Sequence, residues 1–296
     1  MTHPFLTSIN SQMESLPALP TTVSEVMAVT ATPESSANDL MHVIIKDQSM
    51  CSTILKVANS AFFGIPRGVS TIERAVVILG HVEIRNIVIG RALFTSFAKL
   101  NQENKNTVNL FWEHAFTCGL AAKIMGEHLH LPPSELFIAG LIHDIGKLVM
   151  LMAFPNDYPI LQELANPYNL DNSIEERAKF STSHDKVGLQ LAERWLLPEQ
   201  LCMAIGYHHS PQHAPNFRQY PLIVQIADIL SLMYCHSDCM KKEDVEKIFV
   251  DFLSENSSLW SENNLEWKTE NFGLWFDLLQ QHRENDQEIL SIFSSP

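Results

Sequence analysis

Histidine and aspartate side chains interrupt strongly apolar stretches in the second half of the sequence. His143 and Asp144 end the run Leu136–Ile142, and Asp228 lies inside the apolar stretch 221–230. Burying a carboxylate in apolar surroundings is costly unless a cation or hydrogen-bond donors meet it. Because the chain has only 20 Lys and Arg against 34 Asp and Glu, a metal ion is an economical partner for both carboxylates.

Five histidines and two aspartates share this kind of placement, and they are the candidate metal ligands: His114, His143, Asp144, His184, His208, His209 and Asp228. Imidazoles and carboxylates from several helices can surround one or two divalent ions and leave a position for water. A carboxylate shared by two ions about 3.5 to 4 Å apart suits in-line attack on a phosphate ester. Lys147 lies one turn beyond Asp144 and could pair with a phosphate oxygen. Asp144 and Lys147 are therefore the candidate catalytic residues.

The donor types suit a transition metal. Imidazole and carboxylate together bind Fe, Mn, Zn or Ni, and we expect Fe or Mn, with Zn or Ni as alternatives. Each residue also has an ordinary explanation. A single histidine in an apolar helix is more often capped or at the edge of the core, and Asp228 alone could be tied to a helix N-terminus or to Arg218. It is the set as a whole that favours a metal site.

Composition sets limits on the function. Thirteen histidines outnumber the eleven glycines in this chain of 296 residues. The formal net charge of −14 disfavours a nucleic-acid interface built on phosphate contacts, and no run of Lys and Arg offsets it. Hydrophobic residues make up 46% and charged residues 18%, a composition that excludes wholesale disorder. We expect a folded protein that binds no nucleic acid.

The segments that must position the candidate ligands have helical periodicity, and no convincing period-two alternation is found. The sequence therefore predicts an all-α fold. Capping boxes are predicted over residues 22–25 and 70–73, each with the pattern Ser/Thr-x-x-Glu, and Asp47 is a predicted N-cap. Gly80 is a predicted C-cap, and a further helix is expected over residues 82–97.

Several observations concern the compartment. The start of the sequence lacks the basic and apolar regions of a secretory signal, and no apolar stretch reaches the roughly 18 to 20 residues of a transmembrane helix. Five cysteines, an odd number at irregular spacing, do not indicate a disulfide framework. Cys235-His236-x-x-Cys239 resembles a zinc half-site but lacks a second half at the required spacing. We expect a cytoplasmic protein without a membrane partner.

Segments along most of the chain resemble the HD superfamily, which is named for an adjacent His-Asp pair, here His143-Asp144. The resemblance is closest to its HDOD branch, the HD-related output domains of bacterial signalling proteins. The segments that carry it, in chain order, are Leu16–Pro20, Ile44–Asp47, Ala58–Gly64, Ser70–Gly80, Ala139–Gly146 and Ala204–Pro211.

The resemblance implies an HD-domain-like helical bundle with an N-terminal helical subdomain. We accordingly expect an HDOD helical subdomain over residues 1–107, an HD-like bundle with a metal site over 108–240, and an acidic helical extension over 241–296. The polar stretch 100–108 is the expected linker. Aromatic residues in the extension are expected to dock on the chain's own bundle, because such residues at helical spacing more often belong to a core.

The related HD-GYP phosphodiesterases provide a second comparison. Their ligand order of His, His-Asp, His, His-His and Asp is matched throughout, and Lys147 matches the lysine that faces substrate phosphate there. Two features differ. Leu110 replaces the acidic residue one turn before the first histidine, and residues 210–214 replace the Gly-Tyr-Pro signature. The resemblance therefore supports a metal site but gives little support to cleavage of cyclic di-GMP.

Two functions remain open. The first is a bacterial signal-transduction module of the HDOD type, which binds a signalling protein partner or a small phosphorylated ligand. The second is a metal-dependent phosphohydrolase that cleaves phosphomonoesters or phosphodiesters with a metal-activated water. The first is favoured, because the HDOD motifs in the N-terminal half have no obvious catalytic role. No Gly-x-Ser-x-Gly elbow, catalytic-cysteine signature or phosphate-binding glycine loop supports another enzyme class.

Overall fold

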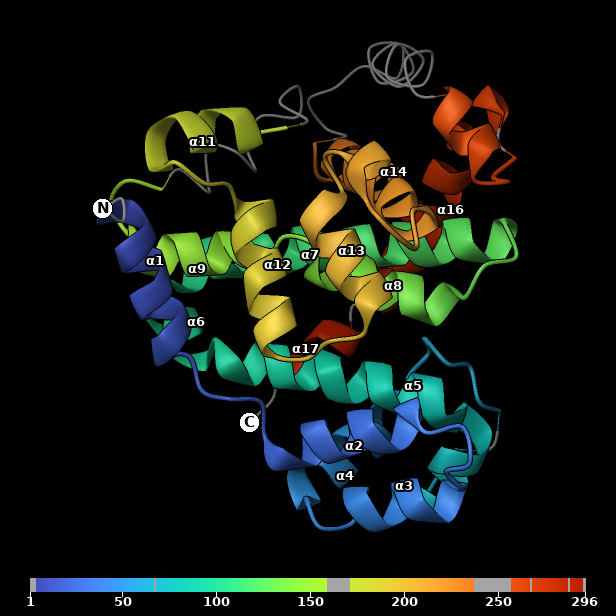
Figure 1. The fold of residues 1–296 in the computed structure, drawn as a ribbon. Coiled ribbons are helices and arrows are strands. Elements are labelled where there is room, and N and C mark those ends of the chain that lie inside the picture. Colours follow the sequence, from blue (N-terminus) through green and yellow to red (C-terminus); the bar gives the residue numbers. More distant parts are fainter. Residues whose placement is uncertain are drawn as a thin grey trace. The chain divides into compact units, whose positions relative to one another are not determined.

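The computed structural model describes residues 4–66, 68–158, 171–236, 257–266, 268–286 and 288–294, and every regular element in these ranges is a helix (Figure 1). The predicted all-α fold is thus confirmed. The chain divides into two compact units. Unit 1 comprises Met1–Ser15 and Asn104–Gln281, and unit 2 comprises Leu16–Glu103 and His282–Pro296. The sequence places its boundaries after residues 107 and 240: the first lies four residues beyond the unit boundary at Glu103, and the second is outside the described residues, so the predicted domains stay a prediction.

Unit 1 holds all the candidate ligands, and its helices are built mainly from the second half of the chain. They are α1 (Pro4–Ser15), α7 (Lys105–His128), α8 (Pro133–Ile142), α9 (Ile145–Ala153), α11 (Ser173–Phe180), α12 (His184–Arg194), α13 (Glu199–Tyr207), the 3₁₀ turn η1 (Pro211–His213), α14 (Gln219–Cys235) and most of α16 (Thr269–Asp286). Helix α7 packs against α8 and α14, and α12 packs against α9 and α13.

Glycines allow two pairs of these helices to touch through their backbones. A Cβ atom on Gly140 would lie 2.8 Å from the Cα atom of Gly119, which fixes the close contact of α8 with α7. A Cβ atom on Gly146 would collide with the carbonyl oxygen of His184 and lie 2.7 Å from the amide nitrogen of Gly188. The absence of a side chain at Gly146 therefore lets α9 and α12 meet where the candidate ligands lie.

Aromatic residues of the C-terminal segment belong to the core of the protein, as the sequence predicts. Trp260, Phe272 and Trp275 are buried, and the rings of Trp275 and His128 form a T-shaped pair with 5.8 Å between centroids. Trp267 and residues 245–253 of this segment lie outside the described residues.

Unit 2 contains α2 (Thr21–Ala31), α3 (Ala37–Ile44), α4 (Gln48–Ala58), α5 (Ile72–Ser96), α6 (Ala98–Glu103) and α17 (Glu288–Ser294). Helix α5 packs against α2, α3 and α4, and α17 packs on α5 and α4. The Arg91 guanidinium donates a 2.6 Å hydrogen bond to the carbonyl oxygen of Phe293, while the Phe293 ring covers Gly90. The end of the chain is thereby joined to the middle of α5.

The helix caps of unit 2 follow the sequence only in part. The predicted cap at Asp47 is confirmed, because its carboxylate accepts from the amide of Met50 at 2.9 Å. At α5 the capping hydroxyl is that of Thr71, one residue after the predicted Ser70. At α2 no side chain caps the helix: Thr22 already lies inside its first turn, so the predicted capping box does not form.

Two predicted helix boundaries have different outcomes. Gly80 has a φ of 80° and a ψ of 175°, a non-helical conformation that separates two helical stretches within α5, in keeping with the predicted helix end and the further helix expected after it. The expected linker over residues 100–108 is largely helical, since α6 ends at Glu103 and α7 begins at Lys105.

One segment, Pro133–Ala153, is long and apolar enough to cross a membrane by length and composition alone, and 89% of its most apolar stretch is buried inside the protein. The sequence did not single it out, because His143 and Asp144 interrupt its two apolar runs. Its burial is that of a core segment, composed of α8 and α9.

Candidate metal centre

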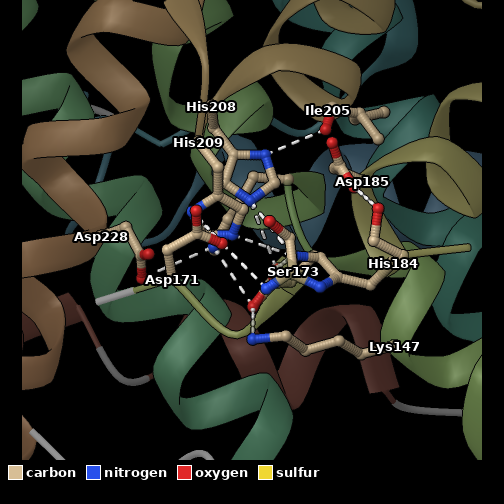
Figure 2. Close-up of polar contacts among 12 residues, drawn as sticks. Lys147, Asp171, Ser173, His184, Asp185, Ile205, His208, His209 and Asp228 are labelled. Carbon is tan, nitrogen blue, oxygen red and sulfur yellow. Dashed lines mark hydrogen bonds and ion pairs between the residues drawn. The ribbon is translucent and has the colours of Figure 1, made fainter. Parts of the chain in front are cut away.

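The structure brings all seven candidate ligands together inside unit 1. Helix α7 carries His114, and the turn between α8 and α9 carries His143 and Asp144. His184 is the first residue of α12, His208 and His209 follow the end of α13, and Asp228 lies in the middle of α14. Figure 2 shows how the labelled side chains from these elements converge.

The ligands form two groups. The three-residue group consists of His114, His143 and Asp228, and the four-residue group consists of Asp144, His184, His208 and His209. Within each group, one nitrogen or oxygen atom from every residue lies within 4.8 Å of the others. This spacing is what donors around a common ion require.

Asp144 joins the two groups through different oxygens. Its Oδ2 atom lies 3.4 Å from His143 Nε2, on the side of the three-residue group. Its Oδ1 atom lies 3.2 Å from His184 Nε2 and 3.6 Å from His208 Nε2. A carboxylate in this position can face two cations at once.

In four of the histidines, the Nδ1 atom is engaged away from the cluster and Nε2 faces into it. His143 and His208 donate from Nδ1 to the carbonyl oxygens of Gly140 (2.7 Å) and Ile205 (2.9 Å). The Nδ1 atom of His114 lies 3.0 Å from Ser231 Oγ, whose own proton goes to the carbonyl oxygen of Asp228. His184 Nδ1 pairs with Glu176, at 2.8 Å. With Nδ1 engaged in this way, Nε2 is the ring nitrogen that each histidine can offer to a metal ion, as in metal-binding histidines.

Several of the inward atoms are buried without a hydrogen bond: His143 Nε2, Asp144 Oδ1 and Asp228 Oδ1. In addition, the Nε2 atom of His184 lies 3.0 Å from that of His209 and 3.4 Å from that of His208. Lone pairs of ring nitrogens repel one another at such distances unless a proton or a metal ion lies between them. The residues present therefore fit a bound transition metal.

The electrostatics of the cluster draw in positive charge. Burial raises the pKa of Asp144, but His143, Lys147 and His184 outweigh this effect and hold it well below its ordinary value. Burial also disfavours protonation of His184, yet the carboxylates of Glu176 and Asp144 raise its pKa to about 10. His209 behaves oppositely, because burial and the neighbouring His208 and His184 hold its pKa well below the usual value.

Lys147 lies on α9 with its Nζ atom 2.7 Å from Asp144 Oδ2, and it is almost fully buried. The structure thus places the predicted phosphate-facing lysine at the edge of the cluster, paired with the carboxylate that joins the two groups. The ordinary explanation of Asp228 does not apply: its ion pairs are with His114 and His143, whereas Arg218 donates to the carbonyl oxygen of Ala214.

Sequence reasoning missed the residues that surround the ligands. Glu176 on α11 contacts His184 and also accepts a hydrogen bond from Tyr158, and Asp171 Oδ1 lies 3.7 Å from His209 Nδ1. Glu176 belongs to the charged segment Glu-Glu-Arg-Ala-Lys, which is typical of a solvated helix face. No spacing in the sequence distinguishes it from Glu175, which is exposed.

Two other sequence features have simple outcomes. Leu110, which replaces an acidic residue of the HD-GYP pattern, is 54% exposed on α7. Cys235 ends α14, and the second cysteine of the supposed zinc half-site, Cys239, lies outside the described residues.

Comparison with known proteins identifies the family. The profile of the HDOD domain matches residues 16–211, about two thirds of the chain. The protein therefore belongs to the HDOD family, as the sequence motifs indicated.

Sequence relatives match only part of their own length to this chain. An uncharacterized protein of Treponema pallidum is 27% identical over 74% of this chain and 42% of its own length. A ribonuclease Y of Desulfotalea psychrophila is 30% identical over 51% of this chain and 22% of its own length. This chain thus spans less than half the length of either relative.

Solved structures share the fold over nearly the whole chain. A candidate phosphohydrolase of Shewanella amazonensis is 19% identical, with a TM-score of 0.68 over 97% of this chain and 98% of its own. A candidate signal transduction protein of Marinobacter aquaeolei is 18% identical, with a TM-score of 0.70 over 98% of this chain and 66% of its own. An HDOD domain protein of unknown function from Geobacter sulfurreducens is 22% identical, with a TM-score of 0.66 over 98% of this chain and 97% of its own.

Proposed function

We propose that this chain is a bacterial signal-transduction protein of the HDOD type whose unit 1 binds one or two divalent transition-metal ions. Its proposed partner is another signalling protein or a small phosphorylated ligand. It is proposed to act in the cytoplasm, away from nucleic acid and membranes, in keeping with a net charge of −14. The observation that supports the metal is the convergence of buried, inward-facing Nε2 atoms on two ionised aspartates.

The residues that would hold the metal are the two groups already defined. The three-residue group would hold one ion, and the four-residue group the other, with Asp144 between them. When bound, such an ion polarises a phosphate oxygen and lowers the pKa of a water molecule. Lys147 pairs with Asp144, where its amino group can meet the phosphate of a ligand. Fe or Mn is the proposed metal, with Zn or Ni as alternatives, because these suit imidazole and carboxylate donors.

Metal analysis of the tag-free protein tests this proposal directly. The protein is purified, its metals are measured, and it is reconstituted in turn with Fe²⁺, Mn²⁺, Zn²⁺ and Ni²⁺. At least one ion per chain is expected in the wild type, and Asp144→Ala should remove it while far-UV circular dichroism stays unchanged. Wild-type protein that retains far less than one ion per chain after every reconstitution would disprove the proposed metal centre.

Metal-dependent phosphohydrolysis is the second candidate function, and the position of Lys147 favours it. A buried lysine next to a carboxylate that faces two groups of ligands is suited to hold a phosphate ester against the centre. The metal-loaded protein is screened with phosphomonoesters, nucleotides, phosphodiesters and a short RNA. Turnover that Asp144→Ala abolishes without unfolding would establish an enzyme and overturn the purely regulatory function.

A further inference from the structure

Glu176 is a buried carboxylate whose two oxygens are both committed to the surroundings of His184. Its side chain is on α11, and the residue is 2% exposed. Its Oε2 atom accepts from the ring Nδ1 of His184 at 2.8 Å and from the backbone amide of the same residue at 2.7 Å. Its Oε1 atom accepts from the hydroxyl of Tyr158 at 2.5 Å. The carboxylate is thus fixed on both sides.

The partner of His184 differs in kind from those of His114, His143 and His208. The Nδ1 atoms of His143 and His208 donate to backbone carbonyls, and that of His114 meets the hydroxyl of Ser231. These acceptors are a backbone carbonyl or a hydroxyl, whereas the acceptor at His184 is a carboxylate. An anionic partner makes an imidazole a stronger donor to a metal than a neutral one does.

We propose that Glu176 is a positioning residue that holds the His184 ring with Nδ1 toward α11 and Nε2 turned toward Asp144, and so strengthens metal binding at the four-residue group. This inference rests on the proposed metal centre. It follows that metal affinity at the four-residue group depends on a carboxylate from α11, whereas metal affinity at the three-residue group does not.

Glu176 also has a structural role, which the test must separate from the proposed one. Because it accepts from the His184 amide in the first turn of α12, it stabilises the start of that helix. Loss of the carboxylate could therefore weaken metal binding through a shifted helix alone. A double-mutant cycle with His184 distinguishes the two, since a purely structural effect does not require the imidazole.

The experiment measures Co²⁺ affinity by competition with a chelator, together with the visible absorption of the bound ion. Glu176→Gln is expected to weaken the affinity by about 10- to 100-fold, the usual cost of losing an outer partner of a ligand, and to alter the Co²⁺ spectrum. Glu175→Gln, which removes the same charge from an exposed position on the same helix, should leave both unchanged. Glu176→Asp keeps the charge and serves as the fallback if Glu176→Gln does not fold, with an intermediate loss expected.

In a His184→Asn background, Glu176→Gln should have no further effect on Co²⁺ affinity. An equal loss in both backgrounds would show that Glu176 acts only through the fold, and an unchanged affinity in the single variant would also overturn the inference. Either outcome can be told apart from failure of the proposed function, because in that case the wild-type protein itself would bind neither Co²⁺ nor Mn²⁺.

Discussion

At the scale of single residues, the central feature is that one carboxylate serves both groups. Asp144 presents Oδ2 to His143 and Oδ1 to His184. A change at Asp144 therefore affects metal binding at both groups, whereas a change at one of the candidate histidines affects only the group to which it belongs. Measuring the metal affinity of each group distinguishes the two cases.

Asp144→Asn should weaken metal binding at both groups, and by more than the roughly 10- to 100-fold that an outer partner contributes, because a direct donor and its charge are lost. His114→Ala should act chiefly on the three-residue group. Isothermal titration with Mn²⁺ would check both. Two equally weakened sites in His114→Ala would contradict the division into groups.

Ser231→Ala removes the neutral partner of the His114 ring, which lies 3.0 Å from it. The ring then loses the contact that fixes its tautomer, so Mn²⁺ affinity of the three-residue group should fall by about 10-fold. Ser261→Ala, in an exposed helical position, is the matched control and should bind Mn²⁺ like the wild type.

The sequence predicts the candidate metal ligands but not the residues that hydrogen-bond to them, and the difference has a physical reason. His143, Asp144 and Asp228 stand out because polar groups are unexpected in apolar helices, and the structure indeed brings the whole predicted set together. That these residues bind metal stays a prediction. Glu176 could not be found, because an acidic residue in the first turn of a charged helix is ordinary, and its burial depends on α12 and Tyr158.

At the scale of helices, backbone contact between α9 and α12 positions the centre. Gly146 follows Asp144 by two residues, and its missing side chain is what allows the start of α12, with His184, to approach. The requirement is one of space, since a Cβ atom there would overlap the His184 carbonyl oxygen. The sequence motif contains this glycine, but only the structure shows what it contacts.

Gly146→Ala should lower the free energy of unfolding by about 1 to 3 kcal/mol or more, the usual cost of inserting a methyl group into a packed core. Gly273→Ala provides the control: it is helical, a Cβ atom at this position would have no neighbour within 4 Å, and it should gain about 1 kcal/mol from better helix propensity. Urea denaturation would measure the change in the free energy of unfolding for both variants. Equal stability of the two variants would contradict the proposed contact.

The kink in α5 yields a separate prediction. Gly80 has open space around it, so sterics with neighbours do not restrict it, but its φ of 80° does. Gly80→Ala should therefore cost about 1 to 3 kcal/mol of unfolding free energy through backbone strain alone. Val77→Ala, on an exposed position of the same helix, should change it little, as measured by urea denaturation.

At the scale of the whole molecule, the two groups of candidate ligands found among the described residues both belong to unit 1. All five tryptophans and all five tyrosines of the sequence also lie within the segments of that unit. Intrinsic fluorescence therefore reports on unit 1, while far-UV circular dichroism reports on the helices of both units.

A metal at 100 times its dissociation constant should stabilise unit 1 by about 2.7 kcal/mol. Tryptophan fluorescence should show this as a later urea transition with Mn²⁺ than with chelator. If the units unfold separately, circular dichroism should show a second transition that Mn²⁺ does not move. A fluorescence transition that Mn²⁺ leaves unchanged would contradict binding in unit 1.

The chain passes between the units three times, after residues 15, 103 and 281, so each unit is assembled from two separate stretches of sequence. Helix α1 belongs to the unit of α9, where the Phe5 ring meets Phe154 at 5.5 Å between centroids, and α17 belongs to the unit of α5. Neither unit is encoded by one continuous stretch of sequence. A gene fragment cut at the 103/104 boundary would encode one unit without α1 and the other without α17, so recombination can transfer this architecture intact only as a whole.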